Sequence, residues 1–375
     1  MLNVNTSIDP VSGGGTAERT LQMSRYLVKS GVDCEILTTD TGLSSAVTEK
    51  LGGIELTACP CIWRRFFVPR RCLGRIRASI AKADIVHLMG HWSVLNVLAY
   101  LFLRILKKPY VVCPAGSLPI YGRSKVLKWA YNALLGNRIM RNAEGVVAVT
   151  EGDRQHMSHY GVPLSRVVVI PNGVELDIGS VGDSRTFRAT HNLENVRIVL
   201  FMGRLNHIKG PDLLLEAFSK IRSNFSNHVL VFAGPDGGML RDLEQYVADN
   251  GMRDSVRFVG YLGETEKVQA YREADLLVIP SRQEPMSIVV LESGREGTPV
   301  MVTDKCDFDV IREINGGIVV PATVCGLKKG LAQILENQNE LRHMGENLGR
   351  YVKSHYGWNS MVQRYCELYE RILVS

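Results

Sequence analysis

The sequence predicts an α/β protein made of two doubly wound domains in series, and three observations favour this fold. The chain has 375 residues, which is enough for two ordinary domains and too many for one small core. Apolar residues make up 45% and charged residues 22%, a composition that excludes a largely disordered chain. Short apolar runs alternate with helical patterns in both halves, as in parallel sheets with crossover helices.

Six strands are predicted in the front half. The first, residues 2–5, precedes the turn at Asp9-Pro10 and is brief, so either the strand is short or the chain begins upstream. The others are residues 33–38, 84–88, 110–113, 145–149 and 167–170. Amphipathic segments at residues 17–29 and 93–106 predict helices.

The back half repeats the pattern after residues 176–195, which have no clear period and predict a linker. Six more strands are expected at residues 197–202, 229–233, 255–259, 275–279, 299–302 and 317–320. An amphipathic segment at 359–373 predicts a closing helix. We therefore expect four parts: residues 1–175, the linker 176–195, residues 196–356 and a C-terminal helix within 357–375.

Several classes of protein are disfavoured. No run of eighteen uncharged apolar residues exists, and the best candidate for a membrane span, residues 94–106, is short and carries Arg104. The N-terminus shows no signal peptide pattern. We expect a cytoplasmic protein. The eight cysteines include no C-x-x-C pair and no zinc spacing; Cys59 and Cys61 are the one close pair, so reduced thiols and no metal are expected.

A glycine-rich stretch, Gly13-Gly14-Gly15, follows the first strand and precedes a helix. Glycines there allow a backbone to approach a phosphate at a helix N-terminus. Asp40 ends the second strand, where a dinucleotide-binding enzyme often holds a ribose. Glu18, however, occupies the position of the third fingerprint glycine, which argues against NAD, and no P-loop motif is present.

A second loop carries two cations. Residues 203–210 follow the first strand of the back half, and Arg204 and Lys209 lie five residues apart in it. Two such cations can neutralise a diphosphate. A solvated basic turn explains the same residues, and the motif alone leaves both alternatives open.

The segment from Glu284 to Glu292 follows a predicted strand. Pro285 suits the first turn of a helix, which would leave the N–H groups of Met286, Ser287 and Ile288 available to an anion. Eight helical residues rise about 12 Å, so the two carboxylates would lie at opposite ends of a polar ligand. Taken alone, the segment is better explained by two surface acids on a helix.

The ordered set of motifs resembles family 4 of the retaining nucleotide-sugar glycosyltransferases, which have the GT-B fold. The matching pieces run along nearly the whole chain: the glycines at 13–15, I-P-N-G-V from Ile170, G-R-L-x-x-x-K-G from Gly203, A-G at 233–234, A-D-L-L-V-I-P-S from Ala274, E-x7-E from Glu284 and G-T-P-V from Gly297.

This resemblance implies two Rossmann-like domains facing each other across a cleft that holds the active site, with the last helix crossing back to the first domain. It implies catalytic roles for Glu284, Arg204 and Lys209. It also implies a donor site built from Gly14, Gly15, Asn172, Gly203, Arg204, Lys209, Tyr261, Glu284, Met286, Ser287, Ile288 and Glu292. The donor would be a UDP- or GDP-linked sugar, and no metal or other cofactor is expected.

The chain departs from the family pattern at two places. Ala115 stands where many relatives carry a histidine, which leaves His87, His91 and Ser117 as candidates on the acceptor side. A histidine at a strand end that is packed or faces solvent explains His87 and His91 at least as well. Met286-Ser287 replaces the common Phe-Gly, which puts the donor sugar in doubt. Asp307-Phe308-Asp309 is a D-x-D motif, the metal signature of the other major glycosyltransferase fold, but it lies in a variable turn, so no metal site is expected there.

Charge is unevenly distributed. Residues 1–174 hold 21 Lys and Arg against 11 Asp and Glu, whereas the rest holds 23 against 27. Residues 63–82 carry seven cations, no acid, and the aromatic side chains of Trp63, Phe66 and Phe67. We expect this segment to contact an anionic membrane. A solvated basic helix with its aromatic residues in the core is the alternative.

The sequence therefore predicts a retaining transferase that moves a sugar to a glycan or lipid-linked acceptor, in the biosynthesis of cell-surface polysaccharide or lipopolysaccharide. The alternatives are a GT-B nucleotide-sugar epimerase, which needs no acceptor, and a non-catalytic relative that binds polyanions. A nucleic-acid-binding role would leave the two glutamates and the Arg204–Lys209 loop unexplained, so no nucleic acid partner is expected.

Overall fold

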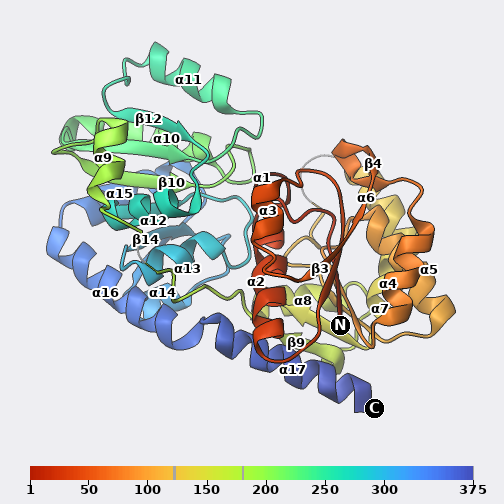
Figure 1. Cartoon of the computed structure of the whole chain (residues 1–375). Coiled ribbons are helices and arrows are strands. Elements are labelled where there is room, and N and C mark those ends of the chain that lie inside the picture. The colour runs from red at the N-terminus through yellow and green to blue at the C-terminus, as the bar shows by residue number, and fades with distance from the viewer. Residues whose placement is uncertain (121–123, 180, 375) are drawn as a thin grey trace. The chain divides into compact units, whose positions relative to one another are not determined.

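Figure 1 draws the computed structural model, which describes residues 1–120, 124–179 and 181–374. The chain divides into two units, each with its own core. Unit 1 comprises Met1–Gly173 and Trp358–Ser375, and unit 2 comprises Val174–Gly357. No helix in the described part of the chain is both long enough and apolar enough to cross a bilayer.

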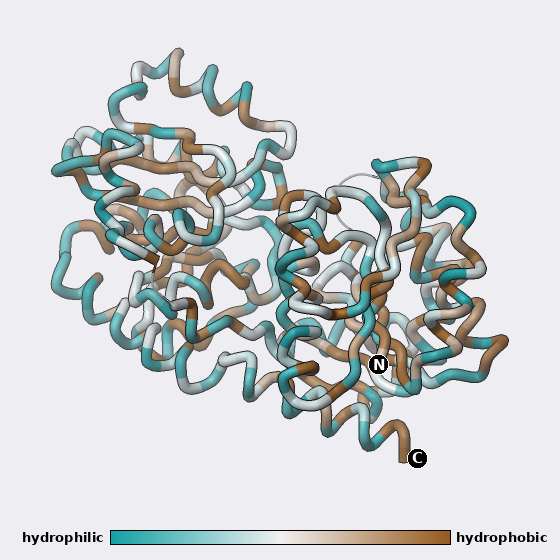
Figure 2. Tube along the Cα trace, viewed as in Figure 1, coloured by the Kyte–Doolittle hydropathy of each residue, from teal (hydrophilic) through white to brown (hydrophobic). Residues whose placement is uncertain are grey.

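Unit 1 contains a seven-stranded sheet in the order β3-β2-β1-β6-β7-β8-β9, with parallel pairing throughout. The strands are β1 Leu2–Val4, β2 Glu35–Thr39, β3 Glu55–Cys59, β6 Val86–Met89, β7 Tyr110–Cys113, β8 Gly145–Ala148 and β9 Val167–Val169. Figure 2 shows apolar residues along the strands, as expected for a sheet covered on both faces.

Helices cover both faces of this sheet. The helices of unit 1 are α1 Pro10–Gly13, α2 Gly15–Lys29, α3 Ser45–Glu49, α4 Leu73–Lys82, α5 Val94–Leu106, α6 Lys125–Tyr131, α7 Asn137–Arg141, α8 Glu151–Ser158 and α17 Trp358–Val374. Side chains of α4, α5, α7 and α8 share one apolar cluster with the sheet. Those of α2 and α17 form the cluster on the opposite face.

The last helix, α17, is part of unit 1. Trp358 at its start stacks on Tyr26 of α2 with ring centroids 6.3 Å apart. Arg19 of α2 is fully buried, and its guanidinium donates hydrogen bonds to the Tyr365 hydroxyl, to Asn172 Oδ1 and to the carbonyl of Ile170. These contacts bring α2, α17 and the segment after β9 together.

Unit 2 contains a six-stranded parallel sheet in the order β12-β11-β10-β13-β14-β15, the Rossmann order. The strands are β10 Arg197–Met202, β11 His228–Ala233, β12 Val256–Gly260, β13 Leu276–Ile279, β14 Val300–Thr303 and β15 Gly317–Val320. All six lie where the sequence predicted them, within one residue at each end.

Eight helices in the described residues accompany this sheet: α9 Arg185–His191, α10 Pro211–Ser219, α11 Leu240–Asp249, α12 Glu264–Glu273, α13 Ile288–Arg295, α14 Val310–Glu313, α15 Val324–Leu335 and α16 Gln338–His355. One face packs against α9, α12, α13 and α14. The other packs against α10, α11 and α15. Side chains of α16 reach both clusters.

The structure corrects the predicted linker. Residues 176–195 belong to unit 2 and include α9, whose Phe187 is buried. Arg188 of α9 forms an ion pair with Glu273 of α12 and donates to the carbonyls of Leu193 and Val196. A short helix tied to a distant element by one arginine has too few turns to show a clear period.

The basic segment 63–82 is not the single basic helix that the alternative expected. Only Leu73–Lys82 is helical, as α4, and the first part is a small hairpin of β4 Cys61–Trp63 and β5 Val68–Pro69, joined by the 3-10 turn Arg64–Phe66. The Trp63 side chain is 58% exposed and packs edge-on against Phe66 at 4.7 Å between centroids. The alternative with aromatic residues buried in the core is therefore wrong.

Candidate active site

The candidate site in unit 2 lies at the carboxyl edge of its sheet. Strands β10 and β13 are neighbours there, although they are not consecutive in the chain. In open α/β sheets ligands bind at such a switch point, between the loops that follow the two strands. The loop after β10 carries Arg204 and Lys209, and the loop after β13 carries Glu284.

Lys209 and Glu284 join these two loops. The Lys209 ammonium forms an ion pair with Oε1 of Glu284, and Ser281 Oγ donates to Oε2 at 2.7 Å. The Glu284 side chain is 12% exposed. Burial alone would raise its pKa, but the charge of Lys209 and the hydrogen bonds to the carboxylate lower it below its usual value. The carboxylate is therefore ionised at neutral pH.

Arg282 fixes the distance between the same loops. Its guanidinium makes a bidentate ion pair with Asp212 of α10, at 2.9 and 2.6 Å, and donates to the carbonyl of His207 at 2.7 Å. Its backbone N–H donates to the carbonyl of Ile208 at 2.8 Å. These bonds hold the residues on both sides of Lys209, and the pairing with Arg282 outweighs burial and lowers the pKa of Asp212.

Glu292, the second predicted carboxylate, lies in α13 and is buried. Lys267 Nζ donates to its Oε1 at 2.6 Å, and the Tyr271 hydroxyl donates to its Oε2 at 2.7 Å. Burial and the neighbouring carboxylate raise the pKa of Tyr271 well above its ordinary value, so this hydroxyl remains a donor. The two α12 residues fix the orientation of the carboxylate, which keeps further lone pairs for hydroxyl groups.

The start of α13 differs from the prediction. The helix begins at Ile288 with Ser287 at the N-cap, so Glu284 lies outside it and the two glutamates do not share one helix. The N–H of Met286 donates to the carbonyl of Cys306 and is not available to an anion. Met286 has a φ of 48°, in the left-handed region, and this turn ends the loop before the helix starts. Met286 and Ser287 are both buried.

Glycines let the strand ends approach one another closely. Gly234 has a φ of 139°, and a Cβ built on it would lie 2.0 Å from the carbonyl oxygen of Gly203. The A-G motif at 233–234 therefore packs directly on the backbone that leads into Arg204. Arg204 itself is half-buried, and its side chain lies beside Gly237.

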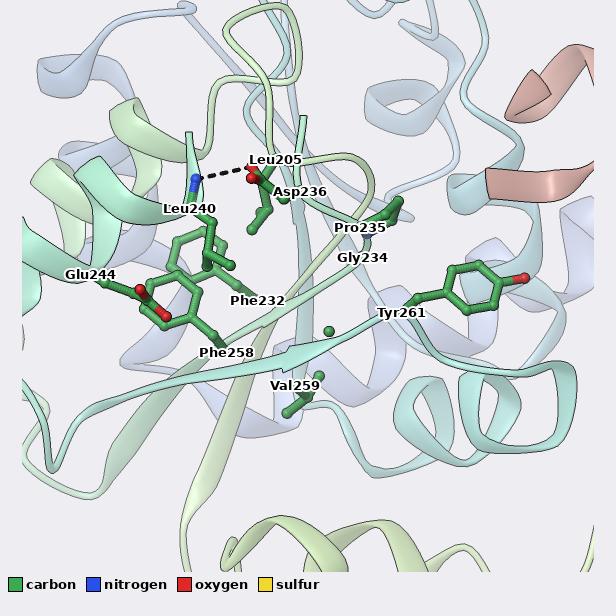
Figure 3. Close-up of a pocket in the computed structure, with 11 residues that line it drawn as sticks. Leu205, Phe232, Gly234, Pro235, Asp236, Leu240, Glu244, Phe258, Val259 and Tyr261 are labelled. Atoms are coloured by element: carbon green, nitrogen blue, oxygen red, sulfur yellow. Dashed lines mark hydrogen bonds between the residues drawn. The ribbon is translucent and has the colours of Figure 1, made fainter. Parts of the chain in front are cut away.

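A pocket of about 450 Å³ opens beside this backbone, between the ends of β10, β11 and β12 (Figure 3). Phe232 and Phe258 give it an apolar wall, and Asp236 and Glu244 contribute carboxylates. Asp236 accepts hydrogen bonds from the N–H groups at the start of α11, which lowers its pKa. Tyr261 lies at the rim with its ring directed away from the two phenylalanines, and it is 51% exposed.

In unit 1 the glycine-rich stretch also follows a strand at a switch point, since β1 and β6 are neighbours. Gly13 ends the short helix α1, which Asp9 caps through its carboxylate, and Gly14 separates α1 from α2 with a φ of 59°. A Cβ on Gly13 would lie 2.7 Å from the carbonyl oxygen of Ser7. Gly15 begins α2, whose N-cap has no side-chain hydrogen bond.

The structure buries two of the histidines that were candidates on the acceptor side. His87 is fully buried; its Nδ1 lies 2.7 Å from the Tyr369 hydroxyl of α17, and burial lowers its pKa to about 3. His91 is 2% exposed, bonded to Asn132 Oδ1 at 2.8 Å, and burial lowers its pKa to about 4. Both side chains pack inside unit 1, His87 against Tyr369 of α17 and His91 against Asn132.

Two further predicted residues have positions set by local structure. Ser117 closes the turn after β7, with its Oγ donating to the carbonyl of Pro114 at 2.6 Å. Ala115 in this turn has a φ of 50°. Asn172, predicted to bind the donor, accepts a hydrogen bond from the buried Arg19.

The D-x-D motif turns its two acids outward. Asp307 and Asp309 are exposed, and Phe308 between them is buried. In the part of the chain that the structure describes, no group of three or more His, Cys, Asp or Glu side chains is arranged to hold a metal ion.

Two family sequence models match the chain. The one described as glycosyl transferases group 1 matches residues 183–350, and the one described as glycosyl transferase 4-like domain matches residues 14–173. Together they cover most of both units. The chain belongs to glycosyltransferase family 4, with the GT-B fold.

Curated relatives of this glycosyltransferase include two named D-inositol 3-phosphate glycosyltransferase. The one from Catenulispora acidiphila is 25% identical over 99% of this chain and 94% of its own length. The one from Geodermatophilus obscurus is 28% identical over 80% of this chain and 73% of its own length. Among solved structures, HepE from Anabaena in complex with UDP-glucose matches with a TM-score of 0.82 at 16% identity, covering 99% of both chains.

Sequence reasoning missed the residues that hold the predicted ones in place: Arg282, Asp212, Lys267 and Tyr271. Each of them contacts a partner that is between 21 and 75 positions away in the sequence. The spacing of residues within one motif therefore gives no signal for it. One hint of these residues was available in the sequence: Arg282 is a charged residue that closely follows the predicted strand 275–279.

Proposed function

We propose that this glycosyltransferase moves a hexosyl group from a UDP- or GDP-sugar to a glycan or lipid-linked acceptor, with retention of anomeric configuration and without a metal. We propose further that the product belongs to cell-surface polysaccharide or lipopolysaccharide. The observation that carries the proposal is the Lys209–Glu284 ion pair across the β10–β13 switch point. It places a cation and an ionised acid side by side where a sugar diphosphate would bind.

The chemistry follows from charge. When the bond between the anomeric carbon and the phosphate oxygen breaks, negative charge develops on the diphosphate. Lys209 and Arg204 stabilise that charge, aided by the N-terminus of α13. The acceptor oxygen bonds to the same carbon on the face that the phosphate leaves, and its proton goes to the leaving phosphate. Glu284 faces the sugar, and Glu292 accepts hydrogen bonds from the ribose hydroxyls.

Similar proteins support a nucleotide donor and a polar acceptor. HepE was solved with UDP and with UDP-glucose. A glycosyltransferase named WaaG, involved in lipopolysaccharide biosynthesis, has the same fold with a TM-score of 0.73. The relatives named for D-inositol 3-phosphate add a phosphorylated polyol to the acceptors worth testing. The pocket beside Tyr261 is the proposed place of the base.

The basic segment 63–82 supports contact with an anionic membrane from the cytoplasmic side. Its hairpin exposes Ile62 and Trp63, with Arg64 and Arg65 exposed beside them. Each cation near an anionic surface contributes about 1 kcal/mol to such binding.

A panel of UDP- and GDP-sugars, incubated with a lipid extract and with soluble glycans, tests the function through nucleotide release. We expect release that depends on both a donor and an acceptor. Turnover of a nucleotide sugar without any acceptor would favour an epimerase. Absence of turnover with every donor, combined with binding of polyanions, would favour a non-catalytic relative.

Lys209→Ala should lower kcat by about a hundredfold or more, because a transition-state charge contact is lost. Lys220→Ala is the matched control, since Lys220 pairs with Glu216 on the surface of unit 2. Steady-state rates of nucleotide release measure both. A Lys209→Ala enzyme with the control's rate would remove the diphosphate assignment.

A further inference from the structure

Helix α6 presents an apolar surface that the described residues of unit 1 leave exposed. None of its residues is buried. Four large apolar side chains in α6 and in the π-helical stretch Asn132–Gly136 that follows it are exposed, by 82% at Val126, 56% at Leu127, 68% at Trp129 and 68% at Leu134. We call these four residues the α6 surface. A helix of a globular domain normally buries one face, and grouped apolar residues in solvent mark a contact site.

The charges around the α6 surface identify the kind of partner. From residue 85 to residue 143 the chain contains eight Lys and Arg and no Asp or Glu. Lys125 and Lys128 lie in α6 itself, and Arg138 and Arg141 follow in α7. Exposed apolar residues with four cations in α6 and α7, in a stretch of sequence without acids, match an anionic bilayer, which offers hydrocarbon and negative headgroups together.

We infer that the α6 surface inserts into the interfacial layer of an anionic membrane and anchors unit 1 there. The cations of α6 and α7 contact the headgroups, and Trp129 with its apolar neighbours enters the acyl boundary. This anchor is separate in the chain from the hairpin at 61–69, which exposes Arg64 and Arg65 beside Ile62 and Trp63. The binding energy of the α6 surface comes mainly from apolar burial.

The anchor has a consequence for the acceptor, and this step rests on the proposed function. Lys128 of α6 lies over the ring of Trp92, 5.5 Å from its centroid. Trp92 is in the loop after β6, at the switch point of the unit 1 sheet. Membrane insertion of α6 therefore brings the carboxyl edge of that sheet to the bilayer surface, where the sugar of a lipid-linked acceptor protrudes.

Sedimentation with vesicles tests the anchor. The vesicles contain equal parts of phosphatidylglycerol and phosphatidylcholine, and phosphatidylcholine alone serves as the neutral comparison. The test variant is Val126→Ser/Trp129→Ser/Leu134→Ser in the full chain. The matched control is Leu164→Ser/Leu373→Ser/Val374→Ser, which changes three apolar residues exposed elsewhere on unit 1. Polar substitutions at exposed positions leave the folding free energy nearly unchanged, and melting curves verify this.

We expect the test variant to lose about tenfold or more of its partitioning onto the anionic vesicles, at both low and high salt, because apolar burial is not screened. The control should bind like the parent protein. Equal binding of the test variant would overturn the inference. So would a parent dimer that becomes a monomer in the test variant while vesicle binding persists, since the α6 surface would then be an interface between copies.

Activity separates this inference from the proposed function. With a soluble acceptor, the test variant should release nucleotide at the parent rate. With a lipid-linked acceptor in vesicles, its rate should fall in parallel with its binding. If the parent protein releases no nucleotide from any donor, the proposed function fails, and the vesicle result still decides whether α6 is an anchor.

Discussion

Arg282 shows how one side chain sets the geometry of two loops. It contacts Asp212 and the carbonyls of His207 and Ile208, so it holds the backbone on both sides of Lys209. It touches no reacting group in the proposed mechanism and acts through the position of Lys209. A displacement of about 1 Å in such a group can lower a rate by as much as a hundredfold.

We expect Arg282→Ala to lower kcat by about tenfold to a hundredfold, because the Lys209 ammonium loses its fixed position. Arg282→Lys should recover only part of the rate, since lysine cannot make the bidentate pair with Asp212. Adding Asp212→Asn to Arg282→Ala should cost little more, because the two side chains act as one unit. A lower melting temperature with unchanged kcat would instead assign Arg282 a role in stability alone.

At the scale of elements, the sequence predicted every strand of the unit 2 sheet and missed one edge strand of the unit 1 sheet, β3. The four inner strands of unit 2, β10, β11, β13 and β14, are almost entirely buried and mostly apolar. The edge strand β3 reads Glu-Leu-Thr-Ala-Cys and is mostly half-exposed, so it lacks such a run. The start of α13 was predicted three residues early, because a left-handed turn at Met286 cannot be read from spacing.

The candidate site likewise contains features that the sequence predicted and contacts that it could not. The loops with Lys209 and Glu284 were predicted, because strand ends and short motifs locate them. The burial of His87 was one of the alternatives left open, and the sequence could not decide it, because its partner Tyr369 is 282 positions away in α17. Contacts between distant segments leave no local pattern in a single sequence.

Helix packing in unit 2 depends on glycine at one contact. A Cβ on Gly345 of α16 would lie 2.0 Å from the carbonyl oxygen of Gly297, after α13. We expect Gly345→Ala to destabilise unit 2 by about 1–3 kcal/mol through overpacking. Gly74→Ala in α4 is the contrasting control, since nothing lies within 4 Å of its Cβ, and it should stabilise unit 1 by about 0.4–1 kcal/mol.

The two outcomes can be measured separately in one protein. All four tryptophans, Trp63, Trp92, Trp129 and Trp358, belong to unit 1. Tryptophan fluorescence during urea unfolding therefore follows the unfolding of unit 1 alone. Circular dichroism follows the loss of helix in both units. An unchanged circular dichroism curve for Gly345→Ala would mean that α16 shifts without cost.

For the whole molecule, acid should weaken unit 1 first. Burial lowers the pKa of His87 to about 3 and that of His91 to about 4, so both stay neutral in the folded state. In the unfolded chain their pKa is about 6.5, so the unfolded state binds more protons below that value. The stability that unit 1 gains by keeping these two histidines neutral is fully present above about pH 6.5, and it is lost as the pH falls towards 4. At about pH 5 the loss is about 2 kcal/mol for each histidine.

Tryptophan-monitored urea unfolding at about pH 7.5 and about pH 5 measures this loss. His87→Gln lowers stability at both pH values but should remove about half of the difference between them. A difference of the same size in His87→Gln as in the parent would show that other groups carry the acid sensitivity of unit 1.

The ion pair between Lys209 and Glu284 bears on the order in which ligands leave. The two charges already satisfy each other in the folded chain, so a ligand at this position must exchange with them. On the proposed function, an intact sugar nucleotide offers a partner to both residues. A nucleoside diphosphate that has lost its sugar competes with Glu284 for Lys209. Its binding leaves the buried Glu284 carboxylate without a cation, and an unpaired buried charge costs free energy. The spent nucleotide is therefore held less firmly than the donor, and re-formation of the internal pair expels it.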